Sequence, residues 1–157
     1  MFNTTYPATV NYKQSLADMI AAVHCDWVDP FFDGYNLPIQ DKDATEVAIQ
    51  LIHFNKDMSS KNILDEFDKR SLRPATLPEL LSFSVAYPGI AWQFPVVALG
   101  SVVQHAHDIE DGLMFRPYED GHLDVPRLWN DFGNRCLRLR CFEGDWYGYY
   151  RFAAISK

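Results

Sequence analysis

Two segments of the chain are apolar at almost every position, which predicts strands buried on both faces. Within residues 45–54, Val47, Ile49 and Leu51 alternate with Ala48, Gln50 and Ile52. Residues 94–103 read Phe-Pro-Val-Val-Ala-Leu-Gly-Ser-Val-Val. A strand with two apolar faces needs cover on both sides. We therefore expect residues 47–52 and 96–101 to be neighbours in one sheet covered by helices, with Gly100 at a bulge or a close backbone approach.

Three helix starts are marked by a capping residue followed by apolar positions at helical spacing. Ser15 precedes Leu16, Met19, Ile20 and Val23, Ser59 precedes Ile63, Leu64 and Phe67, and Thr76 precedes Leu80 and Leu81. Thr76 and Glu79 also match the Thr-x-x-Glu capping box, with Pro78 in the first turn, where a missing N–H costs nothing. The pattern predicts helices from each of these caps, the third ending at Pro88-Gly89.

Shorter strands are expected in residues 6–12, 113–116, 137–142 and 149–155, where β-branched, aromatic or alternating apolar residues gather. We interpret residues 26–43 as an ordered loop, since Trp27, Phe31, Phe32 and Tyr35 require burial. The order of elements indicates an α+β fold. We expect a single domain over residues 1–157, with a mixed or mostly antiparallel sheet packed against about three helices.

Composition and charge narrow the class of protein. With 157 residues, 48% of them hydrophobic, the chain can bury a core without metal or disulfide, and no cofactor is expected. The net charge of −7 argues against nucleic acid as a partner. Cys25, Cys136 and Cys141 form no even framework and are read as reduced thiols of a cytoplasmic protein. No segment has the pattern of a signal peptide or a membrane span.

The densest polar cluster runs from His105 to Asp111. His105 and His107 would share one face of a strand and could, with a nearby carboxylate, bind zinc or iron. The spacing matches no known metal motif, so a solvated loop is the competing interpretation. The chain contains no Gly-x-Ser-x-Gly, Gly-x-Gly-x-x-Gly or phosphate-loop lysine pattern.

Arginines and aromatic residues concentrate near the C-terminus. Arg127, Arg135, Arg138 and Arg140 fall within 14 residues that hold one acid, Asp131, a patch suited to a phosphate or an acidic partner. Alternation places Arg138 and Arg140 opposite a core-facing Leu137-Leu139 face. Trp146, Tyr147 and Tyr149 follow a turn, and Tyr, Trp and Arg often carry interface energy. The competing interpretation is aromatic core packing beside a solvated strand face.

Two resemblances are carried by local motifs. Residues 72–81, 94–101 and 151–154, together with Trp146, resemble segments of a group of uncharacterised bacterial hypothetical proteins, in which the patterns at 26–28 and 53–55 also recur. That resemblance implies membership but no activity. The helix start at residues 73–79 and the pair Arg151-Phe152 are similar to those of C-type-lectin-like and formylglycine-generating folds, which implies a lectin-like ligand-binding domain.

The leading hypothesis is a non-catalytic binding or interaction protein of bacterial or phage type, whose partner is another protein. Its contact residues would be Arg138, Arg140, Trp146, Tyr147 and Tyr149. The alternatives are a metal-dependent enzyme that uses His105 and His107, and a lectin-like domain.

Overall fold

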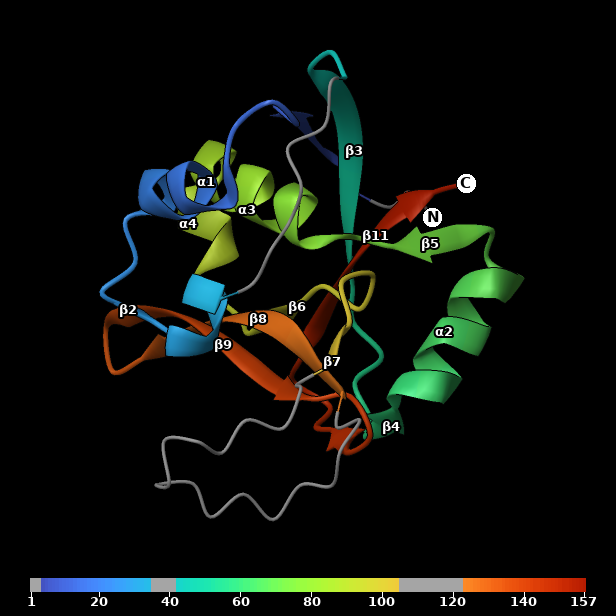
Figure 1. Cartoon of the computed structure of the whole chain (residues 1–157). Coiled ribbons are helices and arrows are strands. Elements are labelled where there is room, and N and C mark those ends of the chain that lie inside the picture. The colour runs from blue at the N-terminus through green and yellow to red at the C-terminus, as the bar shows by residue number, and fades with distance from the viewer. Residues whose placement is uncertain (1–3, 35–41, 105–122) are drawn as a thin grey trace.

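The computed structural model describes residues 4–34, 42–104 and 123–157 (Figure 1). Its helices are α1 (Leu16–Val23), α2 (Ser60–Lys69), α3 (Leu77–Ala86) and α4 (Pro88–Ala91), with a 3₁₀ turn η1 at Pro30–Gly34. The first strands are β1 (Tyr6–Val10), β2 (Trp27–Val28), β3 (Thr45–Ile52), β4 (Met58–Ser59), β5 (Leu72–Pro74) and β6 (Val96–Val97). The remaining strands are β7 (Val103–Gln104), β8 (Leu123–Asp131), β9 (Asn134–Cys141), β10 (Asp145–Trp146) and β11 (Arg151–Ser156).

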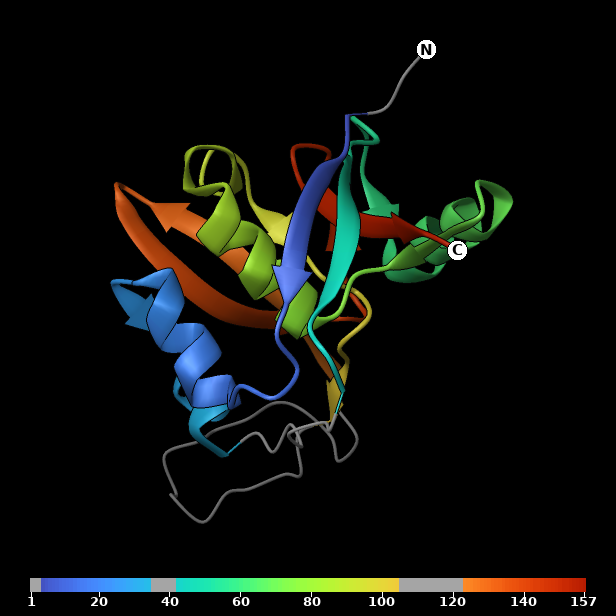
Figure 2. The ribbon, with the colours of Figure 1, turned by 90° about the horizontal axis from the view of Figure 1, so that it is seen from above.

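Within the described residues, nine strands form one mixed sheet in the order β1-β3-β11-β6-β8-β9-β2, with β5 added to β11 and β7 to β8. The pairs β11–β6 and β2–β9 are parallel, and the other pairs are antiparallel. Helices lie on both sides of this twisted sheet, which confirms the expected single α+β domain (Figures 1 and 2). The two apolar segments lie in one sheet but are not neighbours, because β11 pairs with both β3 and β6.

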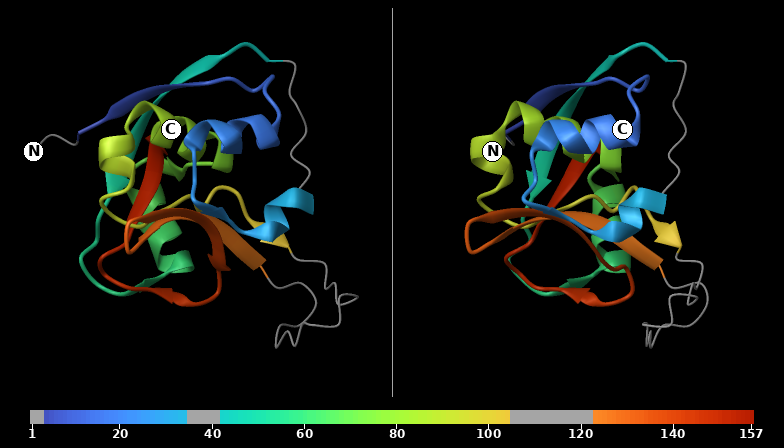
Figure 3. Two further views of the ribbon diagram at one scale, coloured as in Figure 1. Left: turned by 90° about the vertical axis from the view of Figure 1, so that its left-hand side faces the viewer. Right: turned by 60° about the vertical axis from the view of Figure 1, so that its left-hand side comes forward.

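Strand β11 separates two hydrophobic cores. Ala153 and Ile155 face the core formed with α1, α3 and α4, whereas Phe152 and Ala154 face the core formed with α2. All four side chains are buried, so this strand has no polar face. Figure 3 shows α1 and α3 side by side above the β8–β9 hairpin. The helices that begin after Ser59 and Thr76 therefore cover opposite faces of the sheet, as a doubly apolar strand requires.

The predicted N-cap residues Ser15, Ser59 and Thr76 precede α1, α2 and α3. Ser15 Oγ accepts from the Asp18 N–H at 3.1 Å, and Ser59 Oγ accepts from the Asn62 N–H at 3.2 Å. At α3, Thr76 and Glu79 form the capping box, and the Thr76 N–H donates to Glu79 Oε1 at 2.9 Å. Helix α3 has a further cap that the local pattern does not contain.

Ser101 supplies this additional cap from a distant part of the chain. Its Oγ accepts from the Leu77 N–H at 2.6 Å, across 24 residues of sequence. The approach is close because the Gly100 N–H donates to Ala75 O at 2.9 Å. A Cβ at position 100 would lie 2.6 Å from that oxygen, which confirms the expected close backbone approach. The strand expected over residues 96–101 is shorter than predicted, because β6 spans only Val96–Val97.

An ion pair joins β5 to the start of α3. Arg73 donates from Nη1 to Glu79 Oε1 at 2.9 Å and from Nη2 to Oε2 at 2.7 Å, although the Glu79 residue is only 1% exposed. Burial raises the pKa of Glu79, but the hydrogen bonds from Arg73 and Thr76 outweigh that effect and hold it below its ordinary value of 4.5. The carboxylate is therefore charged in the folded protein at neutral pH.

Several expectations for the loops require correction or lie outside the described residues. Phe32 is buried as expected, but Trp27 and Phe31 are exposed. Trp27 lies on β2, the last strand of the sheet order, and Phe31 lies on η1, outside the sheet. Tyr35 and the expected strand at 113–116 lie outside the described residues. None of the helices in the described part of the chain is long and apolar enough to cross a membrane.

Replacing Gly100 by alanine should lower the free energy of unfolding by about 1–3 kcal/mol, because the new Cβ meets the Ala75 carbonyl. Gly89→Ala is the matched control, since no atom lies within 4 Å of a Cβ there and alanine favours the helix. Chemical denaturation of both variants measures the difference. Equal effects at the two positions would contradict the close approach.

Glu79→Gln should lower the free energy of unfolding by about 2 kcal/mol at pH 7, because Arg73 loses its charged partner in a partly buried site. The pKa of Glu79 is lower in the folded than in the unfolded protein. Its stabilisation is therefore present above pH 4.5 and lost as pH falls through the lower folded pKa. Urea denaturation of both proteins across this range should show their difference shrinking below pH 4.5. A difference that stays constant would refute the ion-pair assignment.

Candidate functional site

The β8–β9 hairpin holds three arginines on one face, Arg127, Arg138 and Arg140. In its register Arg127 lies opposite Arg138, and Val125 lies opposite Arg140. Leu128 and Leu137 point into the core under α3. Because side chains alternate along a strand, the arginines point to the other face, where Val125 joins the core covered by α2.

Aromatic rings support the three guanidinium groups. Arg127 lies over Trp129 with 4.8 Å between Cζ and the ring centroid, and Arg138 lies over Trp27 at 4.6 Å. Arg140 lies near three rings, those of Trp146, Tyr147 and Tyr150, at 5.3, 5.8 and 5.7 Å. Such contacts stabilise a cation but leave its charge uncompensated.

Acidic partners for these arginines are scarce. In residues 4–34, 42–104 and 123–157, Asp131 forms their one ion pair, at 3.8 Å from Arg138. The Nε atoms of Arg127 and Arg138 are buried there without a hydrogen-bond partner. Burial lowers the pKa of Arg127, and the charges of Arg140 and Arg138 lower it further, while Tyr150, whose hydroxyl accepts from Arg127, opposes the shift. Among the described residues, this face therefore holds three guanidinium groups and one paired carboxylate, although the whole chain is acidic.

Trp146 is a buried residue, which corrects its expected role as a contact residue. It is 1% exposed, and its Nε1 donates to Ser60 Oγ at 2.8 Å. Ser60 in turn donates to the Phe142 carbonyl at 2.7 Å. The indole also packs edge-on against Tyr150 and Phe152 at centroid distances of 5.0 and 5.8 Å. Trp146 thus links α2 to the C-terminal turn at residues 147–150, and its ring lies next to the guanidinium group of Arg140.

Tyr147 and Tyr149 are the exposed aromatics of the C-terminal turn, at 52% and 48% exposure. Their rings stack with centroids 5.8 Å apart, and Tyr149 also stacks on the buried Tyr150 at 5.1 Å. Arg138 is 36% exposed at its side chain, and Arg140 is partly buried. Four of the five residues predicted as partner contacts therefore reach the surface, on the hairpin and on the turn beside it.

The turn that carries these tyrosines is held by residues that sequence reasoning did not select. His53 Nε2 donates to Gly148 O at 2.8 Å, and Asp57 Oδ1 accepts from the Gly148 N–H at 2.9 Å. A Cβ at Gly148 would lie 2.9 Å from Lys56 N, so the two loops pack backbone against backbone. Fixing Gly148 between the two tyrosines holds their backbones in place before any partner binds.

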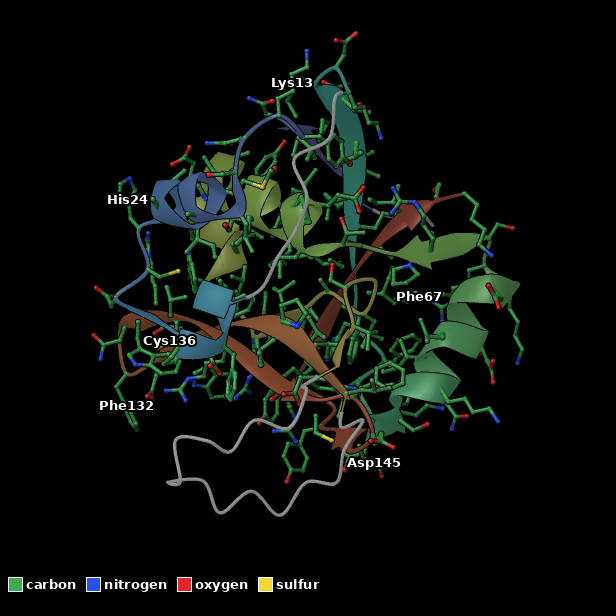
Figure 4. All side chains as sticks on the ribbon, in the orientation of Figure 1. Lys13, His24, Phe67, Phe132, Cys136 and Asp145 are labelled. Carbon is green, nitrogen blue, oxygen red and sulfur yellow. The ribbon has the colours of Figure 1, made fainter. Side chains whose placement is uncertain are left out.

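Arg127 belongs to the predicted four-arginine patch but was not among the predicted contact residues. The turn signals from Asn130 to Asn134 could have predicted its position. A hairpin turn centred between residues 132 and 133 places Arg127 opposite Arg138. Phe132 lies in this turn, fully exposed with a φ of 52°, and Figure 4 shows it at the outer tip of the hairpin. Left-handed backbone is uncommon for a bulky side chain.

The described residues provide few groups for catalysis. They contain no cluster of three or more His, Cys, Asp or Glu side chains that could hold a metal, and His105 and His107 lie outside them. Burial, followed by the nearby Cys136 and Asp26, raises the pKa of the Cys25 thiol to about 11, so it is protonated at neutral pH. A cavity of about 520 Å³ between β1, α1 and α3 is lined by no ionisable side chain.

Comparisons of the chain with protein-family models, with curated proteins and with solved structures found no match.

Trp146→Phe should destabilise the protein by about 2–3 kcal/mol, through the lost hydrogen bond to Ser60 and the smaller ring in the core. Tyr147→Phe is the matched control at an exposed ring, where a change within about 0.5 kcal/mol is expected. Thermal and chemical denaturation measure both. If Trp146→Phe were as stable as the wild type, this would contradict the burial of Trp146 and its hydrogen bond to Ser60.

Proposed function

We propose that this protein is a non-catalytic binding protein whose partner is another protein with an acidic contact surface. The contact residues are Arg138, Arg140, Tyr147 and Tyr149, joined by Trp27. The observation that carries the proposal is the set of guanidinium groups that rest on aromatic rings with a single ion pair in the described part of the chain. A face of this kind offers a partner both apolar surface and positive charge that is mostly not paired with acidic side chains.

The exposed rings along the hairpin support a protein partner. Trp27, Phe132, Tyr147 and Tyr149 are all exposed, and each belongs to β2, to the hairpin or to the turn beside it. Tyr, Trp and Arg are enriched among residues that dominate binding energy, because each combines a large contact area with polar groups. The stacked tyrosines also lose little side-chain freedom on binding.

The charge distribution favours an acidic partner over nucleic acid. The chain has 21 acidic and 14 basic residues, so its net charge of −7 opposes the binding of a long polyanion. An acidic protein patch interacts only with the local face, where the positive field of the three arginines steers its approach.

Replacing both exposed tyrosines, as Tyr147→Ser/Tyr149→Ser, should reduce the enrichment of a specific partner by about tenfold or more in quantitative affinity purification from the native host. Val85→Ser is the matched control, because Val85 is similarly exposed but lies on α3, away from the hairpin. Circular dichroism checks that both variants fold.

The outcomes separate clearly. A partner retained by Val85→Ser and lost by the double variant supports the proposal. A partner lost equally from both variants, or retained equally by both, places the contact elsewhere. A wild-type protein that enriches no partner above a bead control contradicts a protein-binding function.

A further inference from the structure

We propose that Arg127, Arg138 and Arg140 form a seat for one carboxylate group of an acidic peptide segment in the partner. This inference rests on the proposed function and adds to it the chemical group that the surface recognises. It also adds Arg127, a partly buried residue opposite Arg138 in the hairpin, to the proposed contact residues.

The three arginines share one face of the hairpin by strand geometry. Arg127 and Arg138 are directly opposite in an antiparallel pair, so their Cβ atoms lie about 4.5–5.5 Å apart. Arg138 and Arg140 are two residues apart on the same strand and therefore share a face. The guanidinium carbons of Arg127 and Arg140 lie 5.9 and 5.7 Å from the centroid of one ring, that of Tyr150. Arg127 and Arg140 therefore both lie near the ring of Tyr150, and the charges of Arg138 and Arg140 act on Arg127.

The free cluster carries an electrostatic cost. Like charges directly opposite each other in a sheet are destabilising. Only Arg138 has an acidic partner within the described residues, and 3.8 Å is long for a paired carboxylate. The protein elsewhere shows a fully matched pair, Arg73 and Glu79, at 2.9 and 2.7 Å. A bound anion would relieve the repulsion on the hairpin in the same way.

Carboxylate is the group that the surroundings favour. Asp131 already approaches the cluster with a carboxylate from the same hairpin. Tyr147 and Tyr149 border the seat and offer ring faces to the apolar or aromatic neighbours of an acidic residue. A single carboxylate also avoids the repulsion that a nucleic-acid chain would meet from a protein of net charge −7.

The test is a fluorescence-anisotropy titration of the full-length protein with a labelled, end-capped peptide that alternates glutamate and phenylalanine. The matched probes are the same peptide with glutamine in place of glutamate, and oligothymidine of equal length. We expect saturable binding of the acidic peptide, weakened about tenfold or more by the glutamine exchange.

Two arginine variants assign the binding to the seat. Arg138→Gln should weaken the acidic peptide about tenfold, whereas Arg135→Gln, on the opposite face of the same strand, should leave it unchanged. A second variant, Arg127→Met/Tyr150→Phe, removes a partly buried donor and its buried acceptor together, so it should fold normally and also weaken binding.

Several results would overturn the seat. They are acidic and glutamine peptides that bind alike, equal binding by Arg138→Gln and Arg135→Gln, no saturable binding by the wild type, or oligothymidine that binds more tightly than the acidic peptide. If the tyrosine double variant loses the partner while Arg138→Gln keeps it, the seat is wrong and the proposed function stands. If both variants keep the partner, both proposals are wrong.

Discussion

The burial of β11 on both faces is the constraint on which the rest of this structure depends. Phe152 and Ala154 point into one core, and Ala153 and Ile155 point into the other. A strand of this kind is stable only at the centre of a sheet with cover on each side. Strands β3, β5 and β6 pair with it, α2 covers one face, and α1, α3 and α4 cover the other.

The same arrangement shapes the arginine surface. The turn that leads into β11 is held at Gly148 by His53 and Asp57, and Trp146 joins it to α2. These contacts place the rings of Trp146 and Tyr147 beside Arg140, on the arginine-bearing face of the β8–β9 hairpin. The guanidinium groups are supported by aromatic rings instead of by acidic side chains, so the face keeps its positive charge. Structural support and an unsatisfied charge therefore occur together at one place, which is typical of a recognition surface.

Local features of this protein could be predicted from its sequence, and contacts between distant segments could not. The caps at Ser15, Ser59 and Thr76 were predictable because each cap bond spans three residues. The placement of β11 between β3 and β6 was not, since two apolar strands look alike whether adjacent or separated. Trp146 reads as a surface aromatic until Ser60, which lies 86 residues away, is placed beside it. The position of Arg127 opposite Arg138 could be predicted only with the register of the hairpin.

The most direct measurement of the central claim is NMR of the arginine Nε–H groups. Arg127 and Arg138 lie over Trp129 and Trp27 with their Nε atoms buried and without a hydrogen-bond partner among the described residues. We therefore expect two Nε–H resonances that exchange slowly with water and are displaced by ring currents, and that remain so in Asp131→Asn. Rapid exchange and averaged positions, as in solvated arginines, would contradict it.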